Sequence, residues 1–138
     1  MVGQHMIRCW SSTQKTIALS SAEAELTALV KTSCEAIGLS QLVLEWGIEV
    51  KAEVMVDASA ALGVVNRRGS GKLRHVRIGQ LWVQEKRERE EIRFQKVGGT
   101  NNPADLMTKG LDQNTMVGHI DRLNVQRAGG RAEASLSI

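Results

Sequence analysis

Three acidic residues of this 138-residue chain, Glu25, Asp57 and Asp105, stand where chain geometry would bring their carboxylates to one edge of a sheet. Asp57 ends a hydrophobic strand-like segment and directly precedes a helical one, and open α/β sheets place functional groups at such carboxyl ends. Glu25 lies in the first turns of a long helical segment, and Asp105 in the first turn of a helix opened by Pro103. Mg²⁺ prefers such oxygen ligands, and two ions about 3.5–4 Å apart can hydrolyse a phosphodiester bond. The three acids are therefore a candidate two-metal site.

Each acid also has an ordinary structural role to weigh against catalysis. A carboxylate in the first turn of a helix is stabilised by the helix dipole by about 0.3–1 kcal/mol, which covers Asp105 and partly Glu25. Asp57 could cap the helix that follows it. Spacing also fails to choose between Glu23 and Glu25, because both flank the apolar stripe of their helix. Residue spacing alone leaves the metal site and the structural roles both open.

Helices that alternate with strands would position these acids. A capping-box pattern, Ser20 with Glu23 three residues later, predicts the start of a long helix that stops near Gly47. The alternation of strands and helices predicts an α/β layer fold. The expected elements are a short strand at Met6–Trp10, helices at Ser21–Trp46, Ala58–Val65 and Val76–Glu90, strands at Glu53–Asp57 and Ile92–Val97, and a loop at Gly98–Pro103.

Basic residues gather in one acid-free segment, Asn66–Arg77, although the whole chain has a formal net charge of only +3. Lysine and arginine side chains in such a run can bind nucleic-acid phosphates and release their counterions. A solvated loop on a mildly basic protein is the plain alternative. The candidate nucleic-acid-binding residues of this segment are Arg67, Arg68, Lys72, Arg74, His75 and Arg77.

The remaining composition limits the class of protein. Cys9 and Cys34 form no metal-binding spacing and no disulfide framework, which favours an intracellular setting, cytoplasmic or nuclear. No stretch approaches the roughly 20 apolar residues of a membrane span, so no membrane association is expected. Trp46 and Trp82 are expected in the core. The apolar pattern thins after Asp112, which predicts a domain over residues 1–111 and a poorly ordered tail over 112–138.

Four segments, in order over roughly residues 3–111, resemble the ribonuclease H domain of copia-type LTR retrotransposon Pol polyproteins. The first, WSSTQKTIALSSAEAE at residues 10–25, resembles the family's WSSKKQKTVALSSAEAE. The others are VDASAA at 56–61, RHV at 74–76 and NPADLMTKGL at 102–111, which resemble the family's DNQSAI, KHI and N.AD.LTK.L. One such match would be weak, and four in order are specific.

The resemblance implies a ribonuclease H-like mixed sheet with flanking helices. It assigns catalysis and metal binding to Glu25, Asp57 and Asp105, with two Mg²⁺ or Mn²⁺ ions in the intact family site, and leaves Glu23 to its capping role. The implied reaction is hydrolysis of RNA strands paired with DNA. The implied partners are the RNA–DNA hybrid and the reverse transcriptase portion of the polyprotein.

Departures from the family pattern imply an impaired enzyme. Only nine residues precede Trp10 and none is acidic, so the first two strands and the first catalytic Asp of the family are expected to be missing through N-terminal truncation. The loop Gly98–Asn102 contains no His, which puts proton shuttling by a loop His in doubt. Arg77 stands where family members commonly carry Asp. The alternative function is therefore a non-catalytic nucleic-acid-binding or interaction remnant of the domain.

Overall fold

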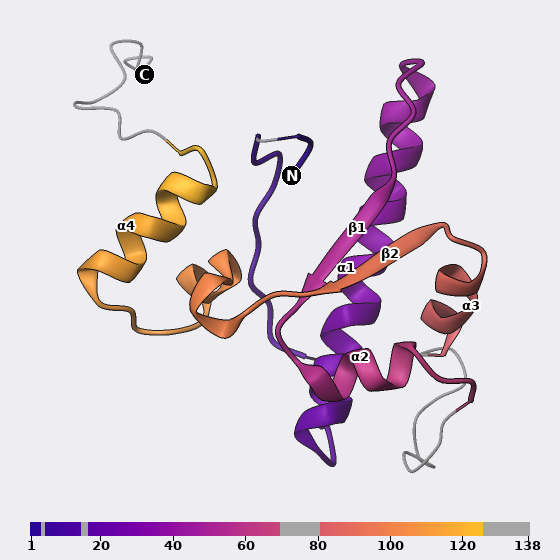
Figure 1. The fold of residues 1–138 in the computed structure, drawn as a ribbon, viewed down its shortest axis with the longest axis horizontal. Coiled ribbons are helices and arrows are strands. Elements are labelled where there is room, and N and C mark those ends of the chain that lie inside the picture. Colours follow the sequence, from indigo (N-terminus) through magenta and orange to yellow (C-terminus); the bar gives the residue numbers. More distant parts are fainter. Residues whose placement is uncertain (4, 15–16, 70–80, 126–138) are drawn as a thin grey trace, which may run out of the picture. The chain divides into compact units, whose positions relative to one another are not determined.

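The computed structural model describes residues 1–3, 5–14, 17–69 and 81–125, which fall into two compact units (Figure 1). The larger unit comprises Thr13–Gly99. The smaller unit joins Met1–Ser12 to the chain from Thr100 onward. Each unit is described by itself below.

Helix α1, Ser21–Glu45, begins at the predicted capping box. The Glu23 N–H donates to Ser20 Oγ over 3.2 Å, and the Glu23 carboxylate in turn accepts from the Leu19 N–H at 2.7 Å. The predicted stop is also confirmed, because Gly47 takes a left-handed φ of 79° and its N–H donates to Leu44 O at 2.8 Å. Local capping chemistry thus sets both ends of the helix that carries Glu25.

The sheet of the larger unit has two parallel strands, β1 (Ala52–Val56) and β2 (Ile92–Lys96), in the register Ala52↔Ile92 to Val56↔Lys96. Both strands were predicted to within one residue at each end. Parallel neighbours need a long crossover, which here contains α2 (Ser59–Val65) and α3 (Trp82–Glu88). Helix α1 packs against β1 and α2. The fold is therefore mixed α/β with a small parallel sheet.

Aliphatic side chains from three helices form the main core of the larger unit. Its buried members are Leu26, Leu29, Ala61, Val64, Val65 and Val83. Burial of a Leu or Val side chain contributes about 1.5–3 kcal/mol, so this cluster holds α1, α2 and α3 together. Trp82 packs against the cluster, as expected. Trp46 was expected in the core, but it is 70% exposed, because α1 has already ended at Glu45.

Two further expectations about secondary structure need correction, one in each unit. Met6–Trp10 forms no strand, because among the described residues no neighbouring strand pairs with its backbone. The helix predicted at Val76–Glu90 is observed as α3 only from Trp82 to Glu88, and residues 76–80 lie outside the described residues.

The 3-10 helix η2 (Gly99–Asn101) begins at the last residue of the larger unit. The smaller unit then contains the 3-10 helix η3 (Pro103–Met107) and the α-helix α4 (Gln113–Arg122). The expectation of a poorly ordered tail from residue 112 is wrong for Gln113–Arg122. The carboxylate of Asp112 caps this helix by accepting from the N–H groups of Asn114 and Thr115, both at 3.0 Å. Helix α4 contacts η3, the segment that carries Asp105.

Candidate functional site

Glu25 lies in the second turn of α1, beside the fully buried Leu26, and its own side chain is half-buried. Its neighbour Glu23 receives the Leu19 N–H and so belongs to the helix cap. The cap does not involve the Glu25 carboxylate. This difference separates two acids that spacing could not distinguish, and it leaves Glu25 as the acid available for a functional role.

Asp57 directly follows β1 at the carboxyl edge of the sheet, and it is exposed. The N-cap of α2 is Ala58, which offers no side-chain cap, so the alternative in which Asp57 caps this helix is wrong. The end of β2 lies at the same edge, where Lys96 Nζ donates to Ser59 Oγ at 2.6 Å. A carboxylate that follows β1 and an ammonium group on the last residue of β2 therefore both lie at this edge of the sheet.

Asp105 lies in η3, whose start matches the sequence pattern. Asn102 is the N-cap and accepts from the Ala104 N–H at 3.2 Å, and Pro103 occupies the first turn. Asp105 is only 7% exposed, and its carboxylate is paired with Lys109, with Nζ at 2.9 Å from Oδ1 and 3.0 Å from Oδ2. The helix expected here is thus a short 3-10 helix that holds a buried, ion-paired carboxylate.

Carboxylate oxygens are the donor set that Mg²⁺ or Mn²⁺ would take, so the chemistry of the three acids fits these ions. The larger unit holds Glu25 and Asp57, and the smaller unit holds Asp105. Within the residues that the structure describes, no three His, Cys, Asp or Glu side chains come together as a metal site. The fit to a metal is therefore one of donor chemistry alone.

Two of the six candidate nucleic-acid-binding residues lie among the described residues. Arg67 and Arg68 follow α2, with Arg67 half-buried and Arg68 exposed. The Arg68 guanidinium donates to Glu88 Oε1 on α3 at 2.8 Å. Lys72, Arg74, His75 and Arg77 lie outside the described residues.

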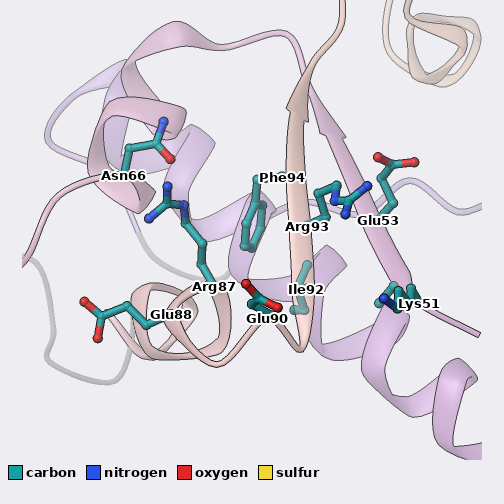
Figure 2. A pocket seen from close by; sticks show the side chains of 10 residues that line it. Lys51, Glu53, Asn66, Arg87, Glu88, Glu90, Ile92, Arg93 and Phe94 are labelled. Atoms are coloured by element: carbon teal, nitrogen blue, oxygen red, sulfur yellow. The ribbon is translucent and has the colours of Figure 1, made fainter.

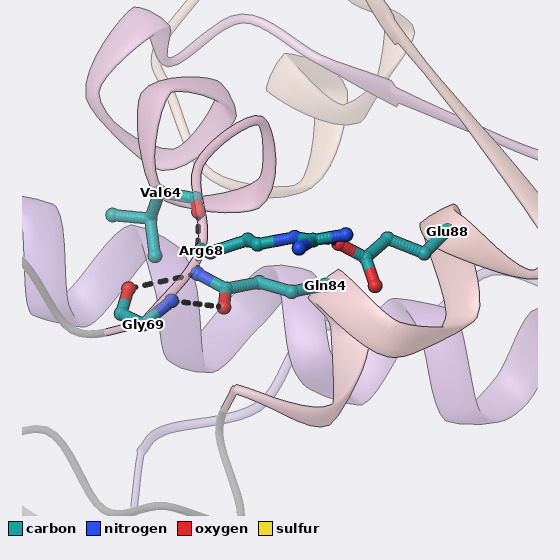
Figure 3. Close-up of polar contacts among 5 residues, drawn as sticks. All are labelled: Val64, Arg68, Gly69, Gln84 and Glu88. Atoms are coloured by element: carbon teal, nitrogen blue, oxygen red, sulfur yellow. Dashed lines mark hydrogen bonds and ion pairs between the residues drawn. The ribbon is translucent and has the colours of Figure 1, made fainter.

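Gln84 on α3 is a structural determinant that sequence reasoning missed. It is 8% exposed, and its side-chain amide bonds to the backbone of the last turn of α2 and of the turn that follows (Figure 3). Its Nε2 donates to Val64 O at 2.7 Å and to Gly69 O at 3.0 Å, and its Oε1 accepts from the Gly69 N–H at 2.9 Å. No local sequence pattern identifies Gln84, because its partners lie 15 and 20 positions away in the chain.

A cavity of about 550 Å³ opens at the opposite edge of the sheet, where both strands begin (Figure 2). Its charged lining is balanced, with three basic and three acidic side chains: Lys51, Arg87, Arg93, Glu53, Glu88 and Glu90. Asp57 stands at the carboxyl edge instead. The cavity and the candidate carboxylate of the larger unit are therefore at different ends of the strands.

None of the described helices is long and apolar enough to cross a membrane.

Comparison with known proteins points to a retroelement. The chain is 31% identical over 106 residues to the retrovirus-related Pol polyprotein from transposon TNT 1-94 of Nicotiana tabacum. The alignment covers 75% of this chain and 8% of that polyprotein. No protein-family profile and no solved structure matches. The similarity supports an origin in a retrotransposon Pol polyprotein.

Proposed function

We propose that this chain is part of a copia-type ribonuclease H domain that hydrolyses RNA in RNA–DNA hybrids. The carrying observation is Asp57, which stands exposed at the carboxyl end of a parallel strand and does not cap the next helix. That is where an α/β sheet presents functional groups. The sequence similarity to a retrotransposon Pol polyprotein supports the same proposal. The reverse transcriptase portion of such a polyprotein is the proposed partner.

Asp105 is included in the proposed site because the segment NPADLMTKGL at residues 102–111 resembles the family segment that carries the last metal-binding carboxylate.

In the proposed site Glu25, Asp57 and Asp105 hold Mg²⁺ or Mn²⁺. When bound, such ions activate water and neutralise charge on a phosphodiester. The carboxylates themselves position the cations, and Glu25 presents its oxygens from a helix whose start is fixed by the Ser20 cap. Arg67 and Arg68 hold the phosphate backbone of the hybrid through charge, without reading sequence.

Incubation of the purified chain with a labelled RNA–DNA hybrid, first in Mg²⁺ and then in Mn²⁺, tests the proposal. Where the wild type cleaves the hybrid, Asp57→Asn should abolish cleavage, whereas the matched control Asp121→Asn, an exposed acid on α4, should leave it unchanged. Cleavage above background that is equal in wild type and Asp57→Asn would refute a catalytic role for Asp57. The same assay on Glu25→Gln and Asp105→Asn tests the other two carboxylates.

A non-catalytic nucleic-acid-binding module is the second candidate. It is favoured by the attachment of the Arg67–Arg68 turn to α3, which holds two basic side chains in place without any need for a metal ion. Tight binding of the hybrid by a folded chain, without cleavage in either metal, would support this function over the first.

A further inference from the structure

Helix α3 holds the turn that carries Arg67 and Arg68 at two points. The first point is Gln84, whose amide engages both the N–H and the C=O of Gly69 and also the C=O of Val64 (Figure 3). Both donors of the amide are used, and the group is nearly buried, so these bonds act in a low-dielectric setting where they are hard to replace with water. The backbone on both sides of the two arginines is therefore fixed by one side chain.

The second point is Glu88, one helical turn after Gln84 on the same helix. Its carboxylate binds the Arg68 guanidinium at 2.8 Å, and both side chains are exposed, at 90% for Arg68 and 47% for Glu88. An exposed ion pair of this kind is weak and is screened by salt. A phosphate group that approaches Arg68 therefore competes with a carboxylate that it can displace.

We infer that α3 controls phosphate binding by this turn through two opposing interactions, with Gln84 as the positioning residue and Glu88 as a competing anion. The inference rests on the proposed nucleic-acid binding, and it names the regulation of that binding. Gln84 raises affinity because the arginine backbone is already ordered before the ligand arrives. Glu88 lowers affinity because its bond to Arg68 must break first. Gln84 and Glu88, four residues apart on one helix, thus change the affinity for phosphate in opposite directions.

Fluorescence anisotropy with an RNA–DNA hybrid and with duplex DNA, over a range of salt concentrations, tests both interactions on the full chain. Gln84→Met keeps the side-chain length but removes every hydrogen bond, and it should weaken binding at least about threefold. The slope of log affinity against log salt should also shrink by about 0.9 for each phosphate that the variant no longer binds. A loss of fold alone would change thermal stability without this selective change in slope.

Glu88→Gln should strengthen binding about two- to fivefold, the factor that corresponds to an exposed ion pair. Glu85→Gln is the matched control, because it makes the same charge change on the same helix but releases Arg89, its partner at 2.6 Å, instead of Arg68. Gln95→Met, an exposed glutamine on β2, is the control for Gln84→Met. Neither control should reproduce the effect of its matched variant.

If Gln84→Met fails to fold, Gly69→Ala replaces it. Gly69 has a φ of 73°, so alanine strains the backbone, and its added Cβ meets no atom within 4 Å. Gly69→Ala should cause the same loss of affinity for nucleic acid and the same decrease in the slope of log affinity against log salt.

Two outcomes would overturn parts of the inference. Wild-type binding by a folded Gln84→Met or Gly69→Ala overturns the positioning role of Gln84. Equal binding by Glu88→Gln and Glu85→Gln overturns the competition of Glu88 with phosphate for Arg68. A wild type that binds neither nucleic acid overturns both. Binding without cleavage counts against the catalytic proposal alone and leaves this inference standing.

Discussion

The Lys109 ammonium lies between the two carboxylate oxygens of Asp105, at 2.9 Å from Oδ1 and 3.0 Å from Oδ2. The two residues are four apart in the chain, and the Asp105 side chain is only 10% exposed, whereas that of Lys109 is 56% exposed. A nearly buried carboxylate is costly without a partner. Lys109 therefore neutralises the charge of a proposed metal ligand from the solvent side.

Lys109→Met should lower the free energy of unfolding by about 1 kcal/mol, because it leaves the Asp105 charge unpaired. The loss should not be larger, because Lys109 is exposed and solvent already weakens the ion pair. Urea unfolding followed by circular dichroism measures the change. The double variant Asp105→Asn/Lys109→Met should recover most of the loss, since a neutral amide needs no cation. Equal stability of the single and double variants would contradict the pairing.

Lys109→Met should also raise the affinity of the chain for Mn²⁺, if Asp105 is a metal ligand as proposed, because the ammonium and the ion compete for the same oxygens. Paramagnetic broadening of the NMR signals of η3 residues, followed during Mn²⁺ titration, measures this binding without an activity assay. Asp105→Asn should show the least broadening. Identical titrations for wild type and both variants would exclude Asp105 from the site.

His119 on α4 is 1% exposed, and neither ring nitrogen has a hydrogen-bond partner among the described residues. A buried polar group without a partner costs about 1–3 kcal/mol, and an apolar group of similar size avoids this cost. His119→Leu should therefore stabilise the chain by about 1 kcal/mol in urea unfolding. A clear loss of stability would show that the imidazole has a role that the described residues do not account for.

The Thr115 hydroxyl at 2.6 Å, together with the Thr115 and Asn114 N–H groups, holds the pKa of the Asp112 carboxyl below its ordinary value of 3.8. Because the folded pKa is the lower one, this contribution to α4 is present above about pH 4 and is lost as the pH falls through the folded pKa. The protection of the α4 amides against exchange, relative to the intrinsic rate at each pH, should fall in that range. Asp112→Asn keeps a capping oxygen and should remove the acid dependence.

Ser20→Ala should destabilise the start of α1 by about 1 kcal/mol, because the Glu23 N–H loses its acceptor. Urea unfolding measures the loss, and Ser21→Ala, an exposed residue just inside the helix, is the matched control. The two variants remove the same hydroxyl group from adjacent positions. A similar effect in both would mean that helix propensity, and not capping, dominates at this end.

Predictions from sequence succeeded where the determinants are local. The Ser20 cap and Gly47 act on backbone groups within a few residues, so the sequence was enough to place both ends of α1. Both strands were recognised from their apolar, β-branched composition. Helix α4 was missed although its Asp112 cap is equally local, because its apolar residues Met116 and Val117 are exposed and give little periodic signal.

Features that depend on distant parts of the chain could not be predicted in this way. Met6–Trp10 has strand-like residues, but a strand also needs a paired neighbour. The hydrogen bonds of Gln84 join residues 15 and 20 positions apart, and no local sequence pattern predicts them. For the candidate site, the sequence predicted Asp57 and Asp105 as candidate metal ligands. It did not predict that Ala58, and not Asp57, is the N-cap of α2, or that Asp105 pairs with Lys109.

The core that joins α1, α2 and α3 has a consequence for the order of folding. Its six buried residues all come from helices, whereas β1 and β2 are separated by the 35 residues from 57 to 91. Closure of so long a loop costs entropy that strand pairing repays only afterwards. The contacts between α2 and α3 lie within this crossover and close a shorter loop, because Val64 and Val83 are only 83 − 64 = 19 positions apart. Packing of α2 on α3 should therefore precede strand pairing, so that Val64 and Val83 contribute to the folding rate while Val54 and Ile92 mainly affect the unfolding rate.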